Sequence, residues 1–163
     1  MKFLNCVIYL ALTGIAGFAI GRIIPPKWIR PEAGWFRSFA FEKDGTVYEK
    51  LGIRKWHKRL PDMSSILPFM MPAKNLSGSY EKRLPVMIRE TCVAEVVHLA
   101  LSILALPCLW IWPGVGGVTA TVIFALLNLP FVIIQRYNRP RLIRLQRKLQ
   151  ARRNQKEVCV CAS

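Results

Sequence analysis

Apolar residues along this chain gather into three long runs, at residues 3–21, 91–112 and 116–134, and polar residues fill the segments between and after them. Each run holds about 20 residues, the length that an α-helix needs to cross the hydrocarbon core of a bilayer. The pattern predicts an all-α integral membrane protein, a single membrane domain over residues 1–163. We expect three transmembrane helices, a basic interfacial loop and a C-terminal interfacial helix.

The first run has two interpretations, a retained span and a cleaved signal peptide. Its amino-terminal flank holds only Lys2, the apolar stretch is long, and no small-x-small cleavage site precedes a secreted-looking domain. We therefore expect the first span to be retained.

The loop at residues 22–89 is polar, basic and broken by prolines, which oppose long helices. Its aromatic residues stand beside Lys and Arg, a mixture that suits the lipid headgroup region. The apolar stretch at residues 65–72 is too short to span, so it either dips into the interface or packs on the spans. A helix is expected to begin after Pro85 and to carry the second run.

The second and third runs are expected to form a hairpin, because Pro113-Gly114 and Gly116-Gly117 mark a tight turn between them. Nearly all of the 24 Lys and Arg residues lie in the 22–89 loop and in the tail at residues 135–163. Basic segments stay on the cytoplasmic side of a membrane. The charge pattern thus predicts a multi-pass cell-membrane protein whose loop and tail are cytoplasmic and whose amino terminus lies outside.

The net charge of +15 would favour nucleic-acid binding if it were spread over a soluble fold. It is instead segregated by the apolar runs and accompanied by no recognised nucleic-acid motif, so membrane lipids are the expected partner and nucleic acid is not. Five cysteines imply no disulfide framework, since three lie in apolar runs. The Cys159-Val160-Cys161 tail could be acylated or bind metal, but a lone Cys-x-Cys is a weak signal.

The strongest catalytic candidates are Glu95 and His98, because ionisable residues inside a membrane helix are costly. At 100° per residue they share one helical face, and Glu90 lies about 80° from His98. A carboxylate that orients an imidazole makes a general-base pair able to take a proton from a hydroxyl. Two other interpretations remain open at this point: a structural hydrogen-bonded pair, and a metal site. Carboxylate metal bundles repeat the Glu-x-x-His motif, which occurs once here, so no metal or resident cofactor is expected.

A second polar cluster lies where the third run ends. Arginine forks there could hold phosphate or carboxylate, and the neighbouring polar side chains add directional partners. Ordinary positive-inside charge is the alternative explanation. The candidate substrate-binding residues are Arg136, Tyr137, Asn138, Arg139 and Arg141. Beyond Pro140, residues 142–149 alternate apolar and basic positions at helical spacing, which is typical of an interfacial helix on anionic lipid.

A third cluster lies in the loop at residues 54–62, where basic side chains surround one tryptophan. It could bind an anionic donor group or rest on lipid headgroups, and the sequence favours neither. Its candidate binding residues are Arg54, Lys55, Trp56 and Asp62.

Together and in this order, these stretches resemble a family of small membrane acyltransferases of carotenoid pigment synthesis, the glycosyl-4,4'-diaponeurosporenoate acyltransferases. The resemblance covers about residues 20–150 and leaves out the first span and the cysteine tail. The matching stretches are Phe41-Glu42-Lys43 with Gly45, Arg54-Lys55-Trp56 with Leu60 and Asp62, Glu90-Thr91 with Ala94-Glu95 and His98, Ser102-Ile103-Leu104, and Gln135-Arg136-Tyr137-Asn138-Arg139-Pro140-Arg141-Leu142.

The resemblance implies transfer of a fatty acyl group from a donor such as acyl-CoA to a sugar hydroxyl of a membrane-embedded lipid. His98 would then be the general base, with Glu95 orienting it, and the basic clusters would bind the donor and stabilise the oxyanion. His57 receives no role. The competing hypotheses are a non-catalytic membrane scaffold and another small lipid-modifying enzyme, although the chain carries no nucleotide-binding glycine motif.

Overall fold

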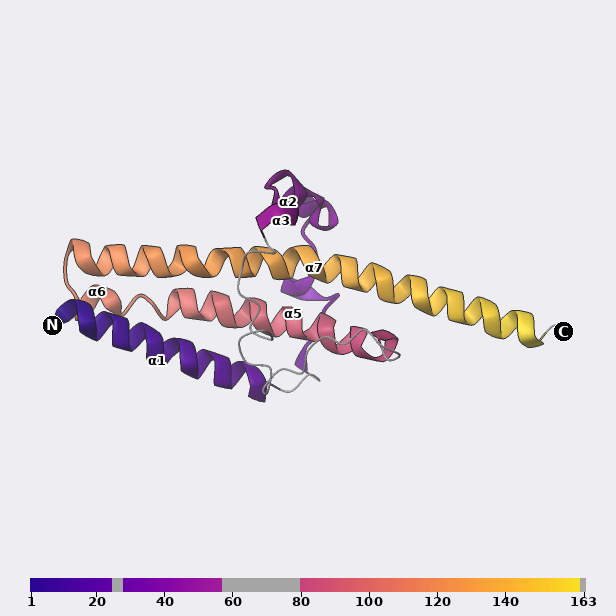
Figure 1. Ribbon diagram of the computed structural model, residues 1–163, viewed down its shortest axis with the longest axis horizontal. Coiled ribbons are helices and arrows are strands. Elements are labelled where there is room, and N and C mark those ends of the chain that lie inside the picture. Colours follow the sequence, from indigo (N-terminus) through magenta and orange to yellow (C-terminus); the bar gives the residue numbers. More distant parts are fainter. Residues whose placement is uncertain (25–27, 57–79, 162–163) are drawn as a thin grey trace.

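The computed structural model describes residues 1–24, 28–56 and 80–161, and throughout these ranges the regular structure is helical. The all-α prediction is confirmed. Four helices build the body of the molecule (Figure 1): α1 (Lys2–Ile23), α5 (Tyr80–Ile103), α6 (Cys108–Ile111) and α7 (Val115–Cys161). Among the described residues, three stretches are long and apolar enough to cross a membrane, Lys2–Ile23, Arg83–Ile111 and Val115–Gln155.

Helix α1 packs against α5 through two glycines one turn apart. A Cβ atom added at Gly17 would lie 3.0 Å from the Leu101 side chain, and one at Gly21 would lie 3.1 Å from Val97. Small residues at this spacing let membrane helices approach closely. The opposite surface of α1 exposes large apolar side chains, as lipid contact requires.

The second span is divided between α5 and α6. The helix begins at Tyr80, before Pro85 rather than after it, and it stops at Ile103 instead of continuing to residue 112. Pro107 accounts for the interruption, because a proline has no N–H to continue the helical hydrogen-bond series.

Side chains from neighbouring helices bond the carbonyl groups at this interruption. The Tyr9 hydroxyl donates to the Leu104 carbonyl at 2.8 Å, and the Thr121 hydroxyl donates to the Ala105 carbonyl at 3.1 Å. In an apolar environment, such partners are what make a helix break tolerable.

Helix α7 is continuous for 47 residues and passes through Pro130 and Pro140. The segment expected to form an interfacial helix after Pro140 is helical, and it extends the third span without a break (Figure 1). Missing proline hydrogen bonds are tolerated when surrounding contacts hold the helix. The packing of α7 against α5 and against the loop supplies those contacts.

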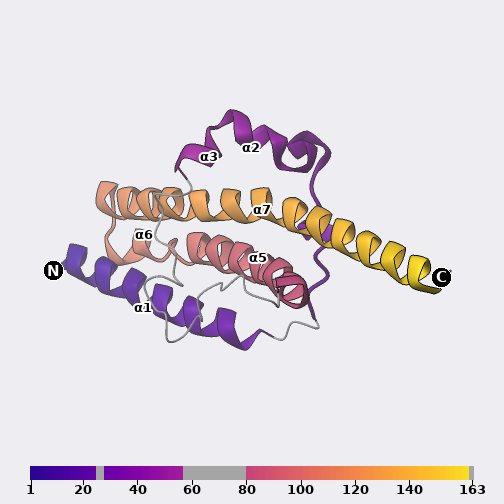
Figure 2. The same cartoon turned by 45° about the vertical axis from the view of Figure 1, so that its right-hand side comes forward.

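In the described part of the loop, four short helices lie against α7: η2 (Gly34–Phe36), η3 (Ala40–Gly45), α2 (Thr46–Lys50) and α3 (Ile53–Trp56). In both views α2 and α3 cover one side of α7, while α5 and α1 lie on its other side (Figure 2). A small core of Tyr48, Ile53 and Tyr137 fixes α2 and α3 to α7. The stretch at residues 65–72 lies outside the described residues.

The amino terminus and the turn between α6 and α7 lie at one end of the bundle, and the carboxyl-terminal end of α7 extends beyond the other. This arrangement fits three spans that alternate in direction. The assignment of the loop and tail to the cytoplasm stays a prediction from charge.

Candidate active site

A buried cluster of four charged side chains joins the loop to both helices of the hairpin. Glu42 comes from η3, Glu95 from α5, and Arg136 and Arg139 from α7; their exposed fractions are 1%, 0%, 9% and 2%. Two carboxylates face two guanidinium groups, so the formal charges balance. Buried charges persist in proteins when they are paired in this way.

Glu95 lies at the centre of this ion cluster. Its Oε1 atom accepts hydrogen bonds from Arg136 Nη1 at 2.6 Å and from Trp35 Nε1 at 3.0 Å, and its Oε2 atom accepts one from Arg139 Nη2. The two arginines can converge on it because positions three apart lie on one face of a helix. Both carboxylate oxygens of Glu95 are therefore engaged.

Arg136 also binds Glu42, through two donors. Its Nε atom lies 2.5 Å from Oε1 and its Nη2 atom lies 3.1 Å from Oε2, a bidentate pair. The Tyr48 hydroxyl donates to the same Oε1 at 2.5 Å, and the Phe39 amide donates to Oε2 at 2.7 Å. One guanidinium thus links the loop carboxylate to the α5 carboxylate.

Arg139 is held as completely. Its Nε atom donates to the Thr91 hydroxyl at 3.1 Å, its Nη2 to the Thr91 carbonyl at 3.1 Å, and its Nη1 to the Phe36 carbonyl at 2.9 Å. Every guanidinium nitrogen of Arg136 and Arg139 therefore donates to a protein group. The two arginines connect elements of the fold and are not open anion-binding sites.

The environment shifts the pKa values of the two loop groups in opposite directions. Burial raises the pKa of Glu42, but the hydrogen bonds from Arg136 and Tyr48 outweigh it, so the pKa falls below its usual 4.5. Burial, together with the hydrogen bond to Glu42, raises the pKa of Tyr48 to about 12. Glu42 is therefore ionised and Tyr48 neutral at physiological pH.

His98 has a different partner from the one expected. The structure corrects the pairing with Glu95, because that carboxylate is turned to the arginines, and the His98 Nδ1 atom instead lies 2.8 Å from Asn128 Oδ1 on α7. The ring also stacks on Phe131, with centroids 4.7 Å apart and planes 8° apart. The imidazole ring is thus fixed at its Nδ1 edge by a hydrogen bond and on one face by stacking.

The hydrogen bonds of Asn128 determine which ring nitrogen of His98 carries a proton. Its Nδ2 atom donates to the Phe124 carbonyl at 2.8 Å, which places Oδ1, an acceptor, opposite the ring. The His98 Nδ1 atom must then carry a proton, and in the neutral imidazole Nε2 is the nitrogen with the lone pair. A neutral imidazole in this tautomer can accept a proton at Nε2.

The other predicted residues are distributed around this centre. Glu90 and Lys55 are exposed, Asn138 is half-buried, and Trp56 packs on the small core around Tyr137. Asp62 lies outside the described residues. Within the ranges that the structure describes, no group of three or more His, Cys, Asp or Glu side chains is placed to hold a metal ion.

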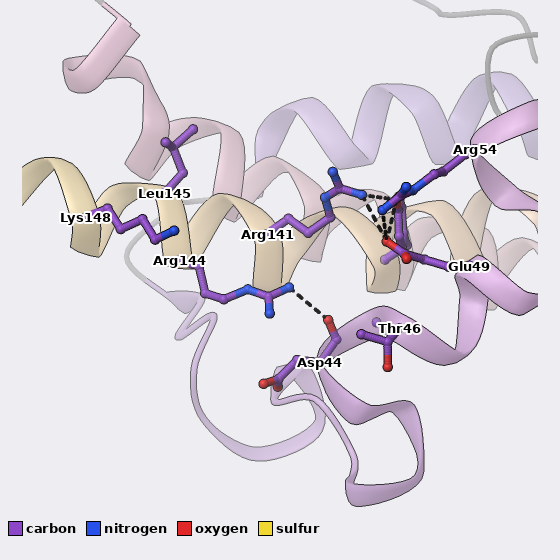
Figure 3. A pocket seen from close by; sticks show the side chains of 10 residues that line it. Asp44, Thr46, Glu49, Arg54, Arg141, Arg144, Leu145 and Lys148 are labelled. Carbon is purple, nitrogen blue, oxygen red and sulfur yellow. Dashed lines mark hydrogen bonds and ion pairs between the residues drawn. The ribbon is translucent and has the colours of Figure 1, made fainter.

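Arg54, Tyr137 and Arg141 come together at a separate place. They line a cleft of about 430 Å³ between the η3–α2 segment and α7 (Figure 3). Arg54 donates to Glu49 at 2.7 Å, and Arg141 donates to the Tyr137 hydroxyl. The predicted basic residues therefore divide between a buried cluster and an open cleft.

Sequence reasoning missed three residues of this site. Asn128 was detectable, as a lone amide in an apolar run is a recognised sign of contact between membrane helices. Glu42 belongs to a stretch that carries the family resemblance, but no local signal pairs it with Arg136, 94 positions away. Tyr48 has no signal of its own, because its role depends on Glu42.

Comparison with known proteins places most of the chain in one family. A model of the glycosyl-4,4'-diaponeurosporenoate acyltransferase family matches residues 32–148. The enzyme of that name from Staphylococcus aureus strain USA300 is 33% identical over 150 residues, 90% of this chain and 89% of the relative. The enzyme from strain MRSA252 is 33% identical over 148 residues with the same coverage. No solved structure matches the chain. The chain is thus an acyltransferase, and it belongs to the glycosyl-4,4'-diaponeurosporenoate acyltransferase family.

Proposed function

We propose that the protein transfers a fatty acyl group from a thioester donor such as acyl-CoA to a hydroxyl of a glycosylated isoprenoid or similar lipid, with His98 as the general base. The acceptor class follows from the names of the relatives, which specify a glycosylated carotenoid acid. An acceptor of this kind dissolves in a bilayer, and His98 lies within one of the apolar stretches long enough to span it.

The observation that carries this proposal is the Nδ1 contact of His98 with Asn128. A base must present an unprotonated nitrogen within hydrogen-bond reach of the proton that it removes. Asn128 holds the proton on Nδ1, so Nε2 is the available atom. Stacking on Phe131 limits rotation of the ring and keeps Nε2 in one direction.

The reaction then proceeds by nucleophilic addition. His98 Nε2 takes the hydroxyl proton as the acceptor oxygen attacks the thioester carbonyl carbon. The C–S bond breaks, the new C–O ester bond remains, and the imidazolium returns its proton to the departing thiolate. The lipid environment keeps water from competing as the nucleophile.

The ion cluster supports this base indirectly. Glu95 and the two arginines fix α5 against α7 one turn from His98, and so keep His98 opposite Asn128. We therefore assign Glu95, Arg136 and Arg139 as positioning residues. Of the basic residues expected to bind the donor, Arg54, Lys55 and Arg141 are exposed and keep that proposed role. The half-buried Asn138 keeps it too, and Glu90 takes no step in this scheme.

The test is acyl transfer by the full chain in lipid nanodiscs, with radiolabelled acyl-CoA and glycosyl-4,4'-diaponeurosporenoate. His98→Ala is expected to lower kcat by roughly 10²- to 10⁴-fold, the usual contribution of a general base. Val96→Ala, which changes an exposed apolar residue of the same helix, is the control and should retain activity. Full activity in a monodisperse His98→Ala preparation would refute the role of His98.

Mass spectrometry of lipids from cells with and without the protein tests the acceptor. An ester of a glycosylated isoprenoid that depends on the protein supports the proposed acceptor. An ester on a different hydroxylated lipid would leave acyl transfer intact but overturn that assignment.

A further inference from the structure

The open cleft on the α2 side of α7 is a second site, separate from the ion cluster. Its volume of about 430 Å³ lies within the roughly 300–1,000 Å³ of small-molecule pockets. Its charged lining residues are Arg54, Arg141, Arg144 and Lys148 against Asp44 and Glu49. Cations thus outnumber carboxylates, which favours an anionic ligand.

The carboxylate of Glu49 forms ion pairs with two of these cations. Glu49 lies 2.7 Å from Arg54 Nη2 and 3.6 Å from Arg141 Nη1, and Figure 3 shows both arginines converging on it. The side chains of Arg54 and Arg141 are 65% and 46% exposed, so donors remain for another acceptor. This end of the cleft is therefore positively charged even with Glu49 ionised.

At the other end Asp44 also lines the cleft, but among the described residues its carboxylate forms no ion pair with Arg144 or Lys148. Arg144 donates from Nη2 to the Asp44 backbone carbonyl at 3.2 Å, an exposed contact that orients the guanidinium without neutralising it. Lys148 follows one turn later on α7 (Figure 3), and it forms no hydrogen bond or ion pair within the described part of the chain. Two neighbouring cations on one face of a helix suit a phosphate group.

The backbone that orients Arg144 is unusual. Lys43, Asp44 and Gly45 all have positive φ, at 45°, 55° and 90°. Non-glycine residues in this conformation are strained and tend to occur at functional sites. The turn presents the Asp44 carbonyl to Arg144 while Gly45 lies against the backbone of Tyr137. The cleft wall is therefore shaped by a specific local conformation.

We propose that this cleft binds the phosphate groups of an anionic ligand, with Arg144 and Lys148 as the main contacts, and that the ligand is the nucleotide part of the acyl donor. The identity of the ligand rests on the proposed acyl transfer, whereas the phosphate site does not. Residues 142–149 then serve in ligand binding as well as in lipid anchoring.

The position of the cleft restricts the donor. Arg144 follows Phe131, the ring stacked on His98, by about 20 Å along α7 at 1.5 Å per residue. The cleft is also lined by residues of η3, α2 and α7, and α2 lies on the opposite side of α7 from α5 (Figure 2), the helix that carries His98. The donor must therefore carry its acyl group on a long flexible arm that passes around α7, as a phosphopantetheine thioester does and a simple acyl phosphate does not.

The site is tested by calorimetry of coenzyme A binding to the full chain in zwitterionic nanodiscs. No acyl acceptor lipid is present. Arg144→Gln and Lys148→Gln should each weaken binding by about tenfold or more, since each removes a charged hydrogen-bond donor. Arg152→Gln removes the same charge from an exposed position outside the cleft and should leave Kd nearly unchanged. Pantetheine without phosphate should not compete. Equal effects of all three variants on Kd would refute the cleft as the binding site.

Nanodiscs containing phosphatidylglycerol distinguish the two sources of phosphate. If coenzyme A does not bind but lipid retention depends on Arg144 and Lys148, the cleft holds a lipid headgroup and the donor assignment is wrong. If neither ligand depends on these residues, the phosphate site is refuted. Because no acyl transfer is measured, these outcomes are independent of the role of His98.

Discussion

Arg136 on α7 donates to Glu95 on α5 across 2.6 Å, and both side chains are buried. The same guanidinium holds Glu42 from the loop, so one arginine connects three parts of the chain. A buried ion pair adds little net stability relative to apolar packing, but removing one member leaves an uncompensated charge. The cluster should therefore specify how the loop, α5 and α7 fit together.

Glu95→Gln tests this relationship. It leaves two buried arginines with one carboxylate, and we expect the free energy of unfolding in detergent to fall by roughly 3–5 kcal/mol. Glu90→Gln, an exposed change on the same helix, should stay within about 0.5 kcal/mol of wild type. Similar unfolding curves for both variants would contradict the ion-cluster interpretation.

Asn128 provides a test of the proposed base that does not change the base itself. Asn128→Leu removes the acceptor for His98 Nδ1, so kcat should fall by about tenfold or more while KM changes little. Asn128→Asp keeps an acceptor oxygen at that position and should retain more activity. A rise in KM with unchanged kcat, or equal loss in both variants, would show that Asn128 does not position His98.

The lowered pKa of Glu42 predicts how the free energy of unfolding depends on pH. Its pKa is lowered on folding, so its stabilising contribution is complete above the unfolded value, near 4.5, and is lost as the pH falls below that value through the folded-state pKa. Other carboxyl groups titrate in the same range, so the informative quantity is the difference between wild type and Glu42→Gln. This difference should shrink as the solution is acidified. A difference independent of pH would mean that Glu42 is not ionised in the cluster.

The sequence predicted the spans and part of the site because those features are local. Apolar runs require only composition and length, and the charged residues Glu95 and Arg136 were conspicuous at the ends of spans. The helix continued through Pro140 because tertiary contacts overrode a local preference. The pairing of Glu42 with Arg136 depends on how the loop folds back over α7, which no spacing rule encodes. Arg144 and Lys148 matched a lipid-anchoring pattern, and only the packing of η3 and α2 made them walls of a cleft.

Gly45 tests whether the loop conformation over α7 is required. Its φ is 90°, and an added Cβ atom would lie 3.3 Å from the Tyr137 carbonyl oxygen, which belongs to a helix and cannot easily move. Gly45→Ala therefore combines backbone strain with a steric clash. Gly34 has a φ of 56° but open space around its Cβ position, so Gly34→Ala carries the strain alone.

We expect Gly34→Ala to lower the free energy of unfolding by about 1 kcal/mol, the cost of a left-handed conformation for alanine. Gly45→Ala should lower it by more and should also weaken coenzyme A binding, because the displaced turn carries the Asp44 carbonyl that orients Arg144. Equal destabilisation by the two variants would show that the close approach to Tyr137 is not needed. Unchanged coenzyme A affinity in a folded Gly45→Ala protein would show that the turn does not contribute to ligand binding in the cleft. The positive φ at Gly45 would then serve the fold alone.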